Sequence, residues 1–338
     1  MTDCRFQLND LLLGTQLAQS SWQKLFLALF QGKLTSLEMK AFLLLASKQG
    51  EEAREIMGCL RVVRRLEPPR RIPIPFLIDV CGTGGDGQRT FNISTVSAFV
   101  IAAAGGYVAK HGNRSVSSKV GSSDLMEALG IRIDAPFPRM LRALKECHFA
   151  YFHAPFYHPT FSKIQPVRRE LGIRTVFNLM GPLVNPLELS FQVIGVTNPA
   201  WMKPMGEALK ILRRRRAALI RSEDGLDELS TRARNDILYL EGKRIKKMRL
   251  NPAAFGFSKP KGNAYAGGDV AENRKIALEI LGGRLRGPRQ DIVLLNSGFA
   301  LWLVGKVSSV REGIEKSRWV LRTGRTLEVL EGLRRITQ

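Results

Sequence analysis

The chain has 338 residues, of which 44% are hydrophobic, and this is enough apolar material for one large domain or two of ordinary size. No apolar run approaches the roughly 20 residues of a bilayer-spanning helix, and the start of the chain lacks the basic-then-apolar order of a signal peptide. We therefore expect a cytoplasmic protein without membrane contact. Fifty-two Lys and Arg against 30 Asp and Glu give a net charge of +22, a balance that attracts polyanions such as nucleic acid.

Residues 8–66 are predicted to form short amphipathic helices. Apolar residues recur at helical spacing from Trp22 to Leu29, and Ser36 precedes a second such pattern with Glu38 in its first turn, as in a capped helix. The proline-rich segment 67–75 cannot continue a helix, so it predicts a linker into the first strand and a domain boundary.

A glycine-rich turn follows the first predicted strand, 76–81. The turn has the sequence GTGGDG (82–87), and an apolar helix then opens at Asn92 and runs towards Ala104. Glycines let the backbone approach a ligand closely, and a helix start offers unpaired N–H groups and the positive end of its dipole, which together favour a phosphate. The turn lacks the lysine of GxxxxGK[ST], and no acidic residue ends the next strand, which argues against an ordinary ATP or NAD site.

A second polar run follows the next apolar strand, 107–109. Cationic and hydroxyl side chains fill 110–119, and Gly121 to Asp124 lead into a helix at 125–129. Two such loops, each at the end of a strand, suit a ligand with two separate phosphate groups.

The remainder of the chain alternates strands and helices. Strands are expected at 149–152, 191–195 and 217–220, and the alternation predicts a mainly parallel sheet with helices on both faces. Asp227 and Glu228 follow the last of these strands, at the edge where open α/β sheets place their sites. They are hard oxygen ligands suited to Mg²⁺; the alternative is a solvated acidic loop.

The excess positive charge lies mostly outside these loops. It is expected to form a solvated basic face, with weak and salt-sensitive nucleic-acid binding at most, because aromatic residues that would stack bases are absent from the basic runs. These runs are 61–71, 213–216, 243–249, 284–289 and 334–335.

The segments GTGGDG, FNIST and AKHGNRSVSSKVGSSD resemble the phosphoribosyl-diphosphate-binding motifs of the anthranilate phosphoribosyltransferase family, and the resemblance extends almost to the C-terminus. It implies an α/β domain of about 71–159 plus 191–338 with a mainly parallel sheet flanked by helices. A smaller, discontinuous all-helical domain is implied for 1–70 plus about 160–190. The implied reaction transfers the 5-phosphoribosyl group from phosphoribosyl diphosphate to anthranilate, in tryptophan biosynthesis. A homodimer through the helical domain is also implied.

The resemblance also implies the site residues, with two Mg²⁺ per site and no residue assigned as general acid or base. Two departures from the family's pattern stand out, Ser123 in place of the common alanine and the segment 232–235 in place of small residues. The implied metal ligands are Ser94, Asp227 and Glu228, and the implied anthranilate-binding residues are Gly82, His111, Asn113, His158, Arg168 and Pro182. The implied donor-binding residues are Gly82, Thr83, Gly84, Gly85, Asp86, Thr90, Asn92, Ser94, Thr95, Lys110, His111, Gly112, Asn113, Ser117, Ser118 and Ser122.

Two alternatives of different classes stay open at this point. One is a related glycosyl-transferring enzyme, either a phosphorylase or a phosphoribosyltransferase for another aromatic acid. The other is a nucleic-acid-binding relative that has kept the fold and lost the chemistry, which the net charge favours and the intact glycine and acidic motifs disfavour.

Overall fold

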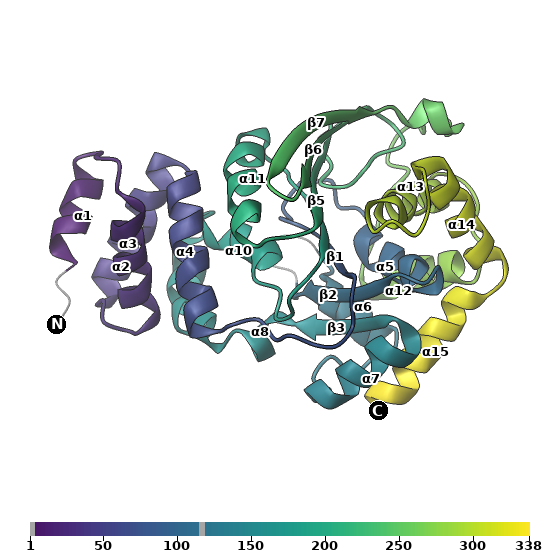
Figure 1. Ribbon diagram of the computed structural model, residues 1–338, viewed down its shortest axis with the longest axis horizontal. Coiled ribbons are helices and arrows are strands. Elements are labelled where there is room, and N and C mark those ends of the chain that lie inside the picture. Colours follow the sequence, from purple (N-terminus) through teal and green to yellow (C-terminus); the bar gives the residue numbers. More distant parts are fainter. Residues whose placement is uncertain (1–3, 115–118) are drawn as a thin grey trace.

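The computed structural model describes residues 4–114 and 119–338, and it consists of a helical part at one end and a seven-stranded sheet covered by helices at the other (Figure 1). The strand order is β3-β2-β1-β4-β5-β6-β7, and the first five strands of this order run parallel. The predicted mainly parallel α/β fold is therefore confirmed. The strands are β1 (Leu77–Gly82), β2 (Tyr107–Gly112), β3 (Phe149–His153), β4 (Phe191–Gly195), β5 (Arg216–Ser222), β6 (Asn235–Glu241) and β7 (Arg244–Leu250).

The helical part begins with four helices whose apolar faces pack together. The start of α3 carries a capping box, in which the Thr35 hydroxyl accepts from the Glu38 N–H at 3.2 Å and the Glu38 carboxylate accepts from the Thr35 N–H at 2.8 Å. The sequence indicated a cap at Ser36, and the structure places it one residue earlier, at Thr35. The helices are α1 (Arg5–Leu12), α2 (Gln19–Phe30), α3 (Ser36–Gln49) and α4 (Ala53–Leu66).

A later segment packs against these helices. The ring of Phe177 lies 6.0 Å from that of Phe26, and the ring of Phe161 lies 5.5 Å from that of Phe30, centroid to centroid. The same core continues through α11 to one face of the sheet, where it includes Leu219. We retain the discontinuous helical domain as a proposal that these contacts support. The segment contains α8 (Ala154–Tyr157), the 3₁₀ turn Pro159–Ile164, α9 (Gln165–Leu171) and α10 (Phe177–Leu183), and α11 (Met202–Ile211) follows β4.

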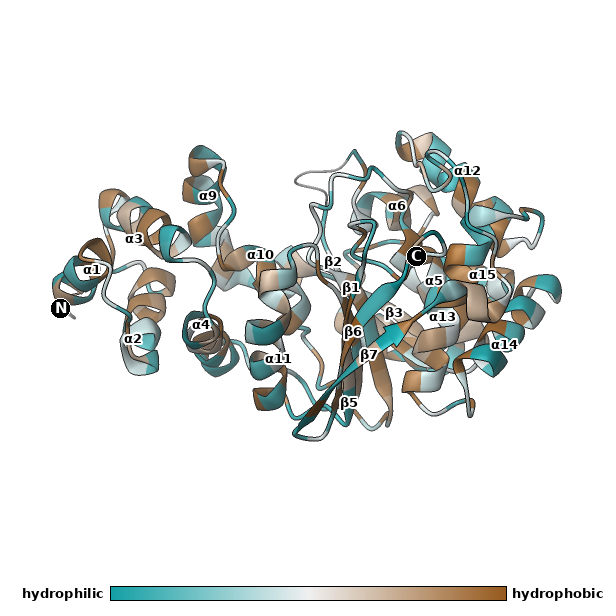
Figure 2. Ribbon diagram, turned by 90° about the horizontal axis from the view of Figure 1, so that it is seen from above, coloured by the Kyte–Doolittle hydropathy of each residue, from teal (hydrophilic) through white to brown (hydrophobic). Residues whose placement is uncertain are grey.

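The other face of the sheet is covered by a second group of helices, with α5 at its centre (Figure 2). All eleven residues of α5 are apolar, Ser or Thr, and nine are buried, because the helix lies between the sheet and α13. No helix in the described part of the chain is long and apolar enough to cross a membrane. The group comprises α5 (Ile93–Ala103), α6 (Ser122–Ala128), α7 (Phe137–Cys147), α12 (Val270–Leu281), α13 (Pro288–Leu303), α14 (Val310–Arg322) and α15 (Arg325–Thr337).

Strands β6 and β7 form an antiparallel hairpin at the edge of the sheet, which the sequence analysis did not identify. Most side chains of β7 are exposed, and its lysines and arginines make this open edge hydrophilic (Figure 2). Charged side chains on an edge strand oppose pairing with another sheet. Protection of this edge strand therefore explains part of the positive charge of the basic run 243–249.

Candidate active site at the carboxyl ends of the strands

The glycine-rich turn after β1 packs directly on the acidic loop after β5. A Cβ atom at Gly82 would lie 2.1 Å from Asp227 Oδ2, and one at Gly195 would lie 1.6 Å from the Asp227 carbonyl oxygen. Only glycine fits at these two positions without displacing the acidic loop. The Gly84 N–H donates to Asp227 Oδ2 at 3.0 Å, so the turn and the carboxylate hold each other in place.

The carboxylates at this junction repel one another. Burial, together with the charge of Asp86, raises the pKa of Asp227 to about 6, and burial with the charge of Asp227 raises the pKa of Glu228 to about 8. Burial also raises the pKa of Asp86. Lys110 opposes the effect on Glu228 only in part. Such a cluster of acids favours a bound divalent cation, which would compensate the shared negative charge.

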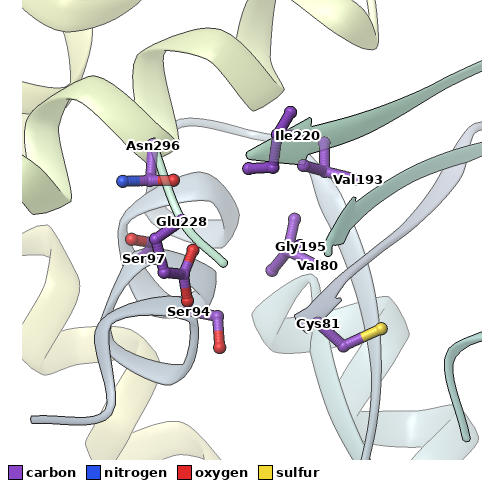
Figure 3. A pocket seen from close by; sticks show the side chains of 9 residues that line it. All are labelled: Val80, Cys81, Ser94, Ser97, Val193, Gly195, Ile220, Glu228 and Asn296. Atoms are coloured by element: carbon purple, nitrogen blue, oxygen red, sulfur yellow. The ribbon is translucent and has the colours of Figure 1, made fainter. Parts of the chain in front are cut away.

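Ser94 and Glu228 line one small pocket, with one oxygen of the Glu228 carboxylate on the side of Ser94 (Figure 3). The Ser94 backbone also forms a hydrogen bond with Glu228. Among residues 4–114 and 119–338, no three His, Cys, Asp or Glu side chains are arranged to hold a metal by themselves. Mg²⁺ commonly takes one or two protein carboxylates and completes its shell with water and substrate phosphates, and the adjacent Asp227 and Glu228 offer such carboxylates.

Asn296 of α13 holds the backbone of the acidic loop in place, and it was not among the residues predicted from the sequence. Its side-chain amide accepts from the Leu229 N–H at 3.0 Å and donates to the Leu229 carbonyl at 2.8 Å. Leu229 directly follows Glu228, so these two bonds set the backbone on which that carboxylate stands. Asn296 lies 67 residues further along the chain than Leu229, inside an apolar helix, and no local pattern distinguishes it from a satisfied core amide.

The second polar run begins inside the sheet. The Lys110 ammonium is buried and donates to the Val80 carbonyl at 2.6 Å and to the Ser94 hydroxyl at 3.3 Å, so it joins β2 to the start of α5. Lys110, which is predicted to bind the donor, therefore has its side chain beneath the glycine-rich turn. It places a positive charge under the helix start where the sequence analysis expected a phosphate.

Close packing also explains Gly112, at the end of β2. A Cβ atom there would lie 2.2 Å from the Ser122 hydroxyl and 2.4 Å from the Tyr151 hydroxyl. Ser122 lies 2.8 Å from Tyr151, and Ser123 bridges Tyr151 and His153 at 2.7 and 2.8 Å. The unusual Ser123 therefore adds a buried link behind Ser122 at the start of α6.

Two of the residues expected to bind anthranilate, His111 and His158, come from different elements and lie close together. The rings of His111 and His158 lie 5.1 Å apart, centroid to centroid. His111 Nδ1 lies 3.0 Å from the Gly181 carbonyl, beside Pro182, and His158 Nδ1 lies 2.7 Å from the Glu67 carboxylate. Burial, with the nearby His158, lowers the pKa of His111 to about 3, so it is neutral at physiological pH. The Nε2 atoms of both rings are buried without a partner in the described structure, as expected where a ligand binds.

Arg168 lies on α9, and packed aromatic rings connect it to His158. Its guanidinium is 5.6 Å from the centre of the Phe177 ring, which packs on Phe161, and Phe161 in turn packs on His158. Within the residues that the structure describes, the Arg168 side chain forms no ion pair or hydrogen bond. Burial lowers its pKa. An arginine without an acidic partner, in partly apolar surroundings, suits a substrate carboxylate.

The remaining predicted residues make the following contacts. Asn92 Nδ2 donates to the Val120 carbonyl at 3.1 Å and so connects the two polar runs. The Thr95 hydroxyl is buried without a partner in the described structure, and the Asn113 side chain is exposed. Ser117 and Ser118 lie outside the described residues. Other predicted residues have the following contacts: Thr83 with Thr197, Gly85 with Arg174, Asp86 with the Gln88 N–H, and Thr90 bridged to Ala266.

Arg174 is a second residue that the sequence analysis missed. Its guanidinium donates to the Gly85 carbonyl in the glycine-rich turn and lies 5.8 Å from the Trp201 ring centre. The Ser47 hydroxyl of α3 donates to the Arg174 carbonyl at 2.7 Å. Arg174 thus connects the helical part of the molecule to the turn.

Known proteins resemble this chain over almost its whole length. Residues 75–327 match the glycosyl transferase family, a/b domain. An anthranilate phosphoribosyltransferase from Bacillus cereus is 40% identical over 323 residues, covering 96% of this chain and 94% of the relative. The crystal structure of anthranilate phosphoribosyltransferase from Thermus thermophilus matches with a TM-score of 0.90 at 37% identity and covers 98% of both chains. The enzyme from Saccharomyces cerevisiae in complex with PRPP and Mg matches with a TM-score of 0.90 at 26% identity, covering 99% of this chain and 97% of that one.

Proposed function

This chain belongs to the anthranilate phosphoribosyltransferase family, and we propose that it transfers the 5-phosphoribosyl group from phosphoribosyl diphosphate to anthranilate. The products are N-(5-phosphoribosyl)anthranilate and diphosphate, in tryptophan biosynthesis. The observation that carries this proposal is the contact between the glycine-rich turn and the acidic loop, in which Gly82 and Gly84 pack on Asp227. This contact brings a helix start that suits an anion and an acid pair that suits a cation to the carboxyl ends of the same strands.

We propose that the donor binds between the two polar runs. Gly82 to Asp86 and the start of α5, with Asn92, Ser94 and Thr95, face one phosphate group, and Lys110 adds positive charge beneath them. Gly112 at the end of β2, with Asn113, Ser117, Ser118 and Ser122 after it in the sequence, forms the second phosphate-binding run, and Thr90 lies beside the first.

Asp227, Glu228 and Ser94 would hold Mg²⁺, two ions per site in our proposal. The bound metal would compensate the negative charge of the leaving diphosphate. The raised pKa values of the two acids, with one lysine against three carboxylates, support a cation at this position. The solved S. cerevisiae enzyme contains both PRPP and Mg, which supports the same pairing here.

We place anthranilate between the histidine pair and Arg168. The Arg168 guanidinium would bind its carboxylate, and His111, His158, Asn113 and Pro182 would line the pocket together with Gly82. Because His111 Nδ1 donates to the Gly181 carbonyl, the free Nε2 of the neutral imidazole can accept one hydrogen bond from the amine without adding charge.

The reaction is a displacement at the anomeric carbon. The aromatic amine nitrogen forms a bond to C1 of the ribose while the bond from C1 to the diphosphate oxygen breaks, and the nitrogen then releases one proton to solvent. A neutral aromatic amine is already a nucleophile, so holding both substrates in line and stabilising the leaving group can supply most of the rate. No protein nucleophile or covalent intermediate is needed.

Association and location are further parts of the proposal. Large apolar side chains are exposed on the N-terminal helices, with Phe6 74%, Leu13 72% and Leu37 76% accessible. Exposed apolar residues that gather on one part of a molecule mark an interaction surface. We propose that this part forms the contact of a homodimer and that the protein acts in the cytoplasm.

A fluorescence assay tests the function. Purified protein, anthranilate, phosphoribosyl diphosphate and Mg²⁺ should give loss of anthranilate fluorescence, and chelation of the metal should stop it. Parallel reactions with other aromatic acids, and with nucleosides plus phosphate, separate the related activities. Conversion of one of these and not of anthranilate would replace the proposed acceptor.

A further inference from the structure

Three basic runs that are separate in the sequence line one groove. It is formed by Arg61, Arg64 and Arg65 of α4, by the loop 213–215 before β5, and by Lys243 in the turn between β6 and β7. Eight of its ten lining residues are Arg or Lys, and none is Asp or Glu. We call this region the basic groove.

The basic groove and the candidate active site lie at opposite ends of the strands. Residues 213–215 precede β5, whereas Asp227 and Glu228 follow it. The Arg215 N–H donates to the Ser190 carbonyl, just before β4, so the groove adjoins the amino ends of these strands. It is therefore separate from the substrate-binding residues proposed above.

One guanidinium in the groove is buried and held in a fixed orientation. Arg214 is 3% exposed, and it donates from Nε to Gln192 Oε1 at 3.2 Å and from Nη1 to the Leu189 carbonyl at 3.1 Å. Burial and the charge of Arg64 lower the pKa of Arg214 to about 9. Both partners of Arg214 are neutral, so its charge is stabilised by hydrogen bonds without a paired carboxylate.

Most of the other cations of the groove also lack a paired carboxylate among the described residues. Among the lining residues, within the described structure, Lys210 alone forms an ion pair, with Glu207 at 2.8 Å. Glu188 attracts Arg64 and Arg214, but its carboxylate is bonded to Arg71 at 2.7 Å. Arg61 and Arg65 stand four residues apart on α4, a spacing at which like charges destabilise a helix. An anion in the groove would relieve this repulsion.

We propose that the basic groove binds the phosphodiester backbone of a nucleic acid without reading its bases. The cations come from three elements along the groove, which suits a linear polyanion better than a single small anion. The lining residues include no aromatic side chain, so bases would not be stacked, and binding would depend on phosphate contacts alone.

Two variants of equal net charge test the proposal. The groove variant is Arg61→Gln/Arg65→Gln/Arg213→Gln/Lys243→Gln. The control, Lys259→Gln/Lys261→Gln/Arg284→Gln/Arg286→Gln, removes four exposed cations elsewhere. Each lowers the charge from +22 to +18, since 22 minus 4 is 18. Binding of fluorescein-labelled single-stranded oligonucleotides of two unrelated sequences is measured by anisotropy over a range of salt concentrations, and circular dichroism verifies that both variants fold.

We expect the wild type to bind both sequences alike, with affinity that falls steeply as salt rises. The groove variant should bind at least about tenfold more weakly, with a salt slope smaller by about 0.7 for each phosphate that it no longer neutralises. The control should stay close to the wild type, and turnover of anthranilate should be unchanged in both. Equal weakening in the two variants would show attraction by net charge alone and overturn the proposal, as would a clear preference for one sequence or no binding at low salt.

Discussion

The side-chain amide of Asn296 bonds both the N–H and the carbonyl of Leu229, at 3.0 and 2.8 Å. A helix in the core therefore holds the backbone of the acidic loop at the residue next to Glu228. Ser97 of α5 lies in the same pocket with its hydroxyl buried and without a partner in the described structure (Figure 3). The position of Glu228 thus depends on α13 as well as on the loop itself.

Replacing Asn296 should impair the metal-dependent step as well as stability. Asn296→Ala removes two bonds to Leu229 and leaves buried backbone groups unpaired, at a cost of about 1 to 3 kcal/mol for each. We expect a higher Mg²⁺ requirement and a higher KM for phosphoribosyl diphosphate, with the KM for anthranilate little changed. Steady-state kinetics over a range of Mg²⁺ concentrations measures this.

Asn273→Ala is the matched control for that variant. Asn273 is a buried asparagine on α12 that donates to the Gly268 and Asp269 carbonyls, and within the described residues it forms no hydrogen bond to the acidic loop. It should lower the melting temperature without moving the Mg²⁺ requirement. If the two variants shift the Mg²⁺ requirement equally, Asn296 acts only through general stability.

Arg168 should determine the affinity for anthranilate. Losing one charge-assisted bond to a carboxylate costs about 1.5 to 3 kcal/mol, which is roughly tenfold to more than a hundredfold in binding. Arg168→Ala should raise the KM for anthranilate by about this factor and leave that for the donor nearly constant. Arg168→Lys should recover part of the loss, because it keeps the charge without the planar fork.

The neighbouring Arg169 provides the comparison, since it is exposed on the same helix. Arg169→Ala should behave as the wild type. A shift in the donor KM with anthranilate unaffected in Arg168→Ala would place this arginine at the other substrate and reverse the proposed orientation of the site.

Glu55 should make the helical part less stable as the pH rises. Its side chain is 1% exposed, one carboxyl oxygen has no partner in the described structure, and burial raises its pKa well above 4.5. Below pH 4.5 the group is protonated in both states, so it costs nothing. Above pH 4.5 the unfolded chain releases a proton that the folded chain retains, and stability falls by at most about 1.4 kcal/mol per pH unit until the folded group also ionises.

Glu55→Gln should therefore melt at a higher temperature than the wild type at pH 8, and the difference should shrink at pH 5. Calorimetry at both pH values measures it. Glu328→Gln, at an exposed carboxylate, should show no such pH-dependent gain. A wild-type melting temperature that rises relative to Glu55→Gln between pH 5 and pH 8 would contradict the assignment.

Much of the fold was predictable because its signals are local. The glycine turn, the apolar helix after Asn92 and the alternating strands predicted the parallel sheet, and the motifs predicted the family; both are confirmed. The hairpin 235–250 was missed because its exposed strand is rich in Lys and Arg, which are typical of a solvated run.

The parts of the site that the sequence did not indicate depend on long-range contacts. Asn296 and Arg174 reach the acidic loop and the glycine turn from elements distant in the chain. The gathering of Arg61, Arg213 and Lys243 in one groove is likewise set by the tertiary fold. The roles of the predicted donor, acceptor and metal residues remain predictions.

The most direct test of the proposed site compares the wild type with Asp227→Asn/Glu228→Gln in the anthranilate fluorescence assay, across a Mg²⁺ titration. The wild type should form N-(5-phosphoribosyl)anthranilate only with Mg²⁺ present. The double variant should fold normally, turn over far more slowly, and recover in part at high Mg²⁺. Absence of product from the folded wild type, or a double variant with the same activity and Mg²⁺ dependence, would contradict the assignment of this site.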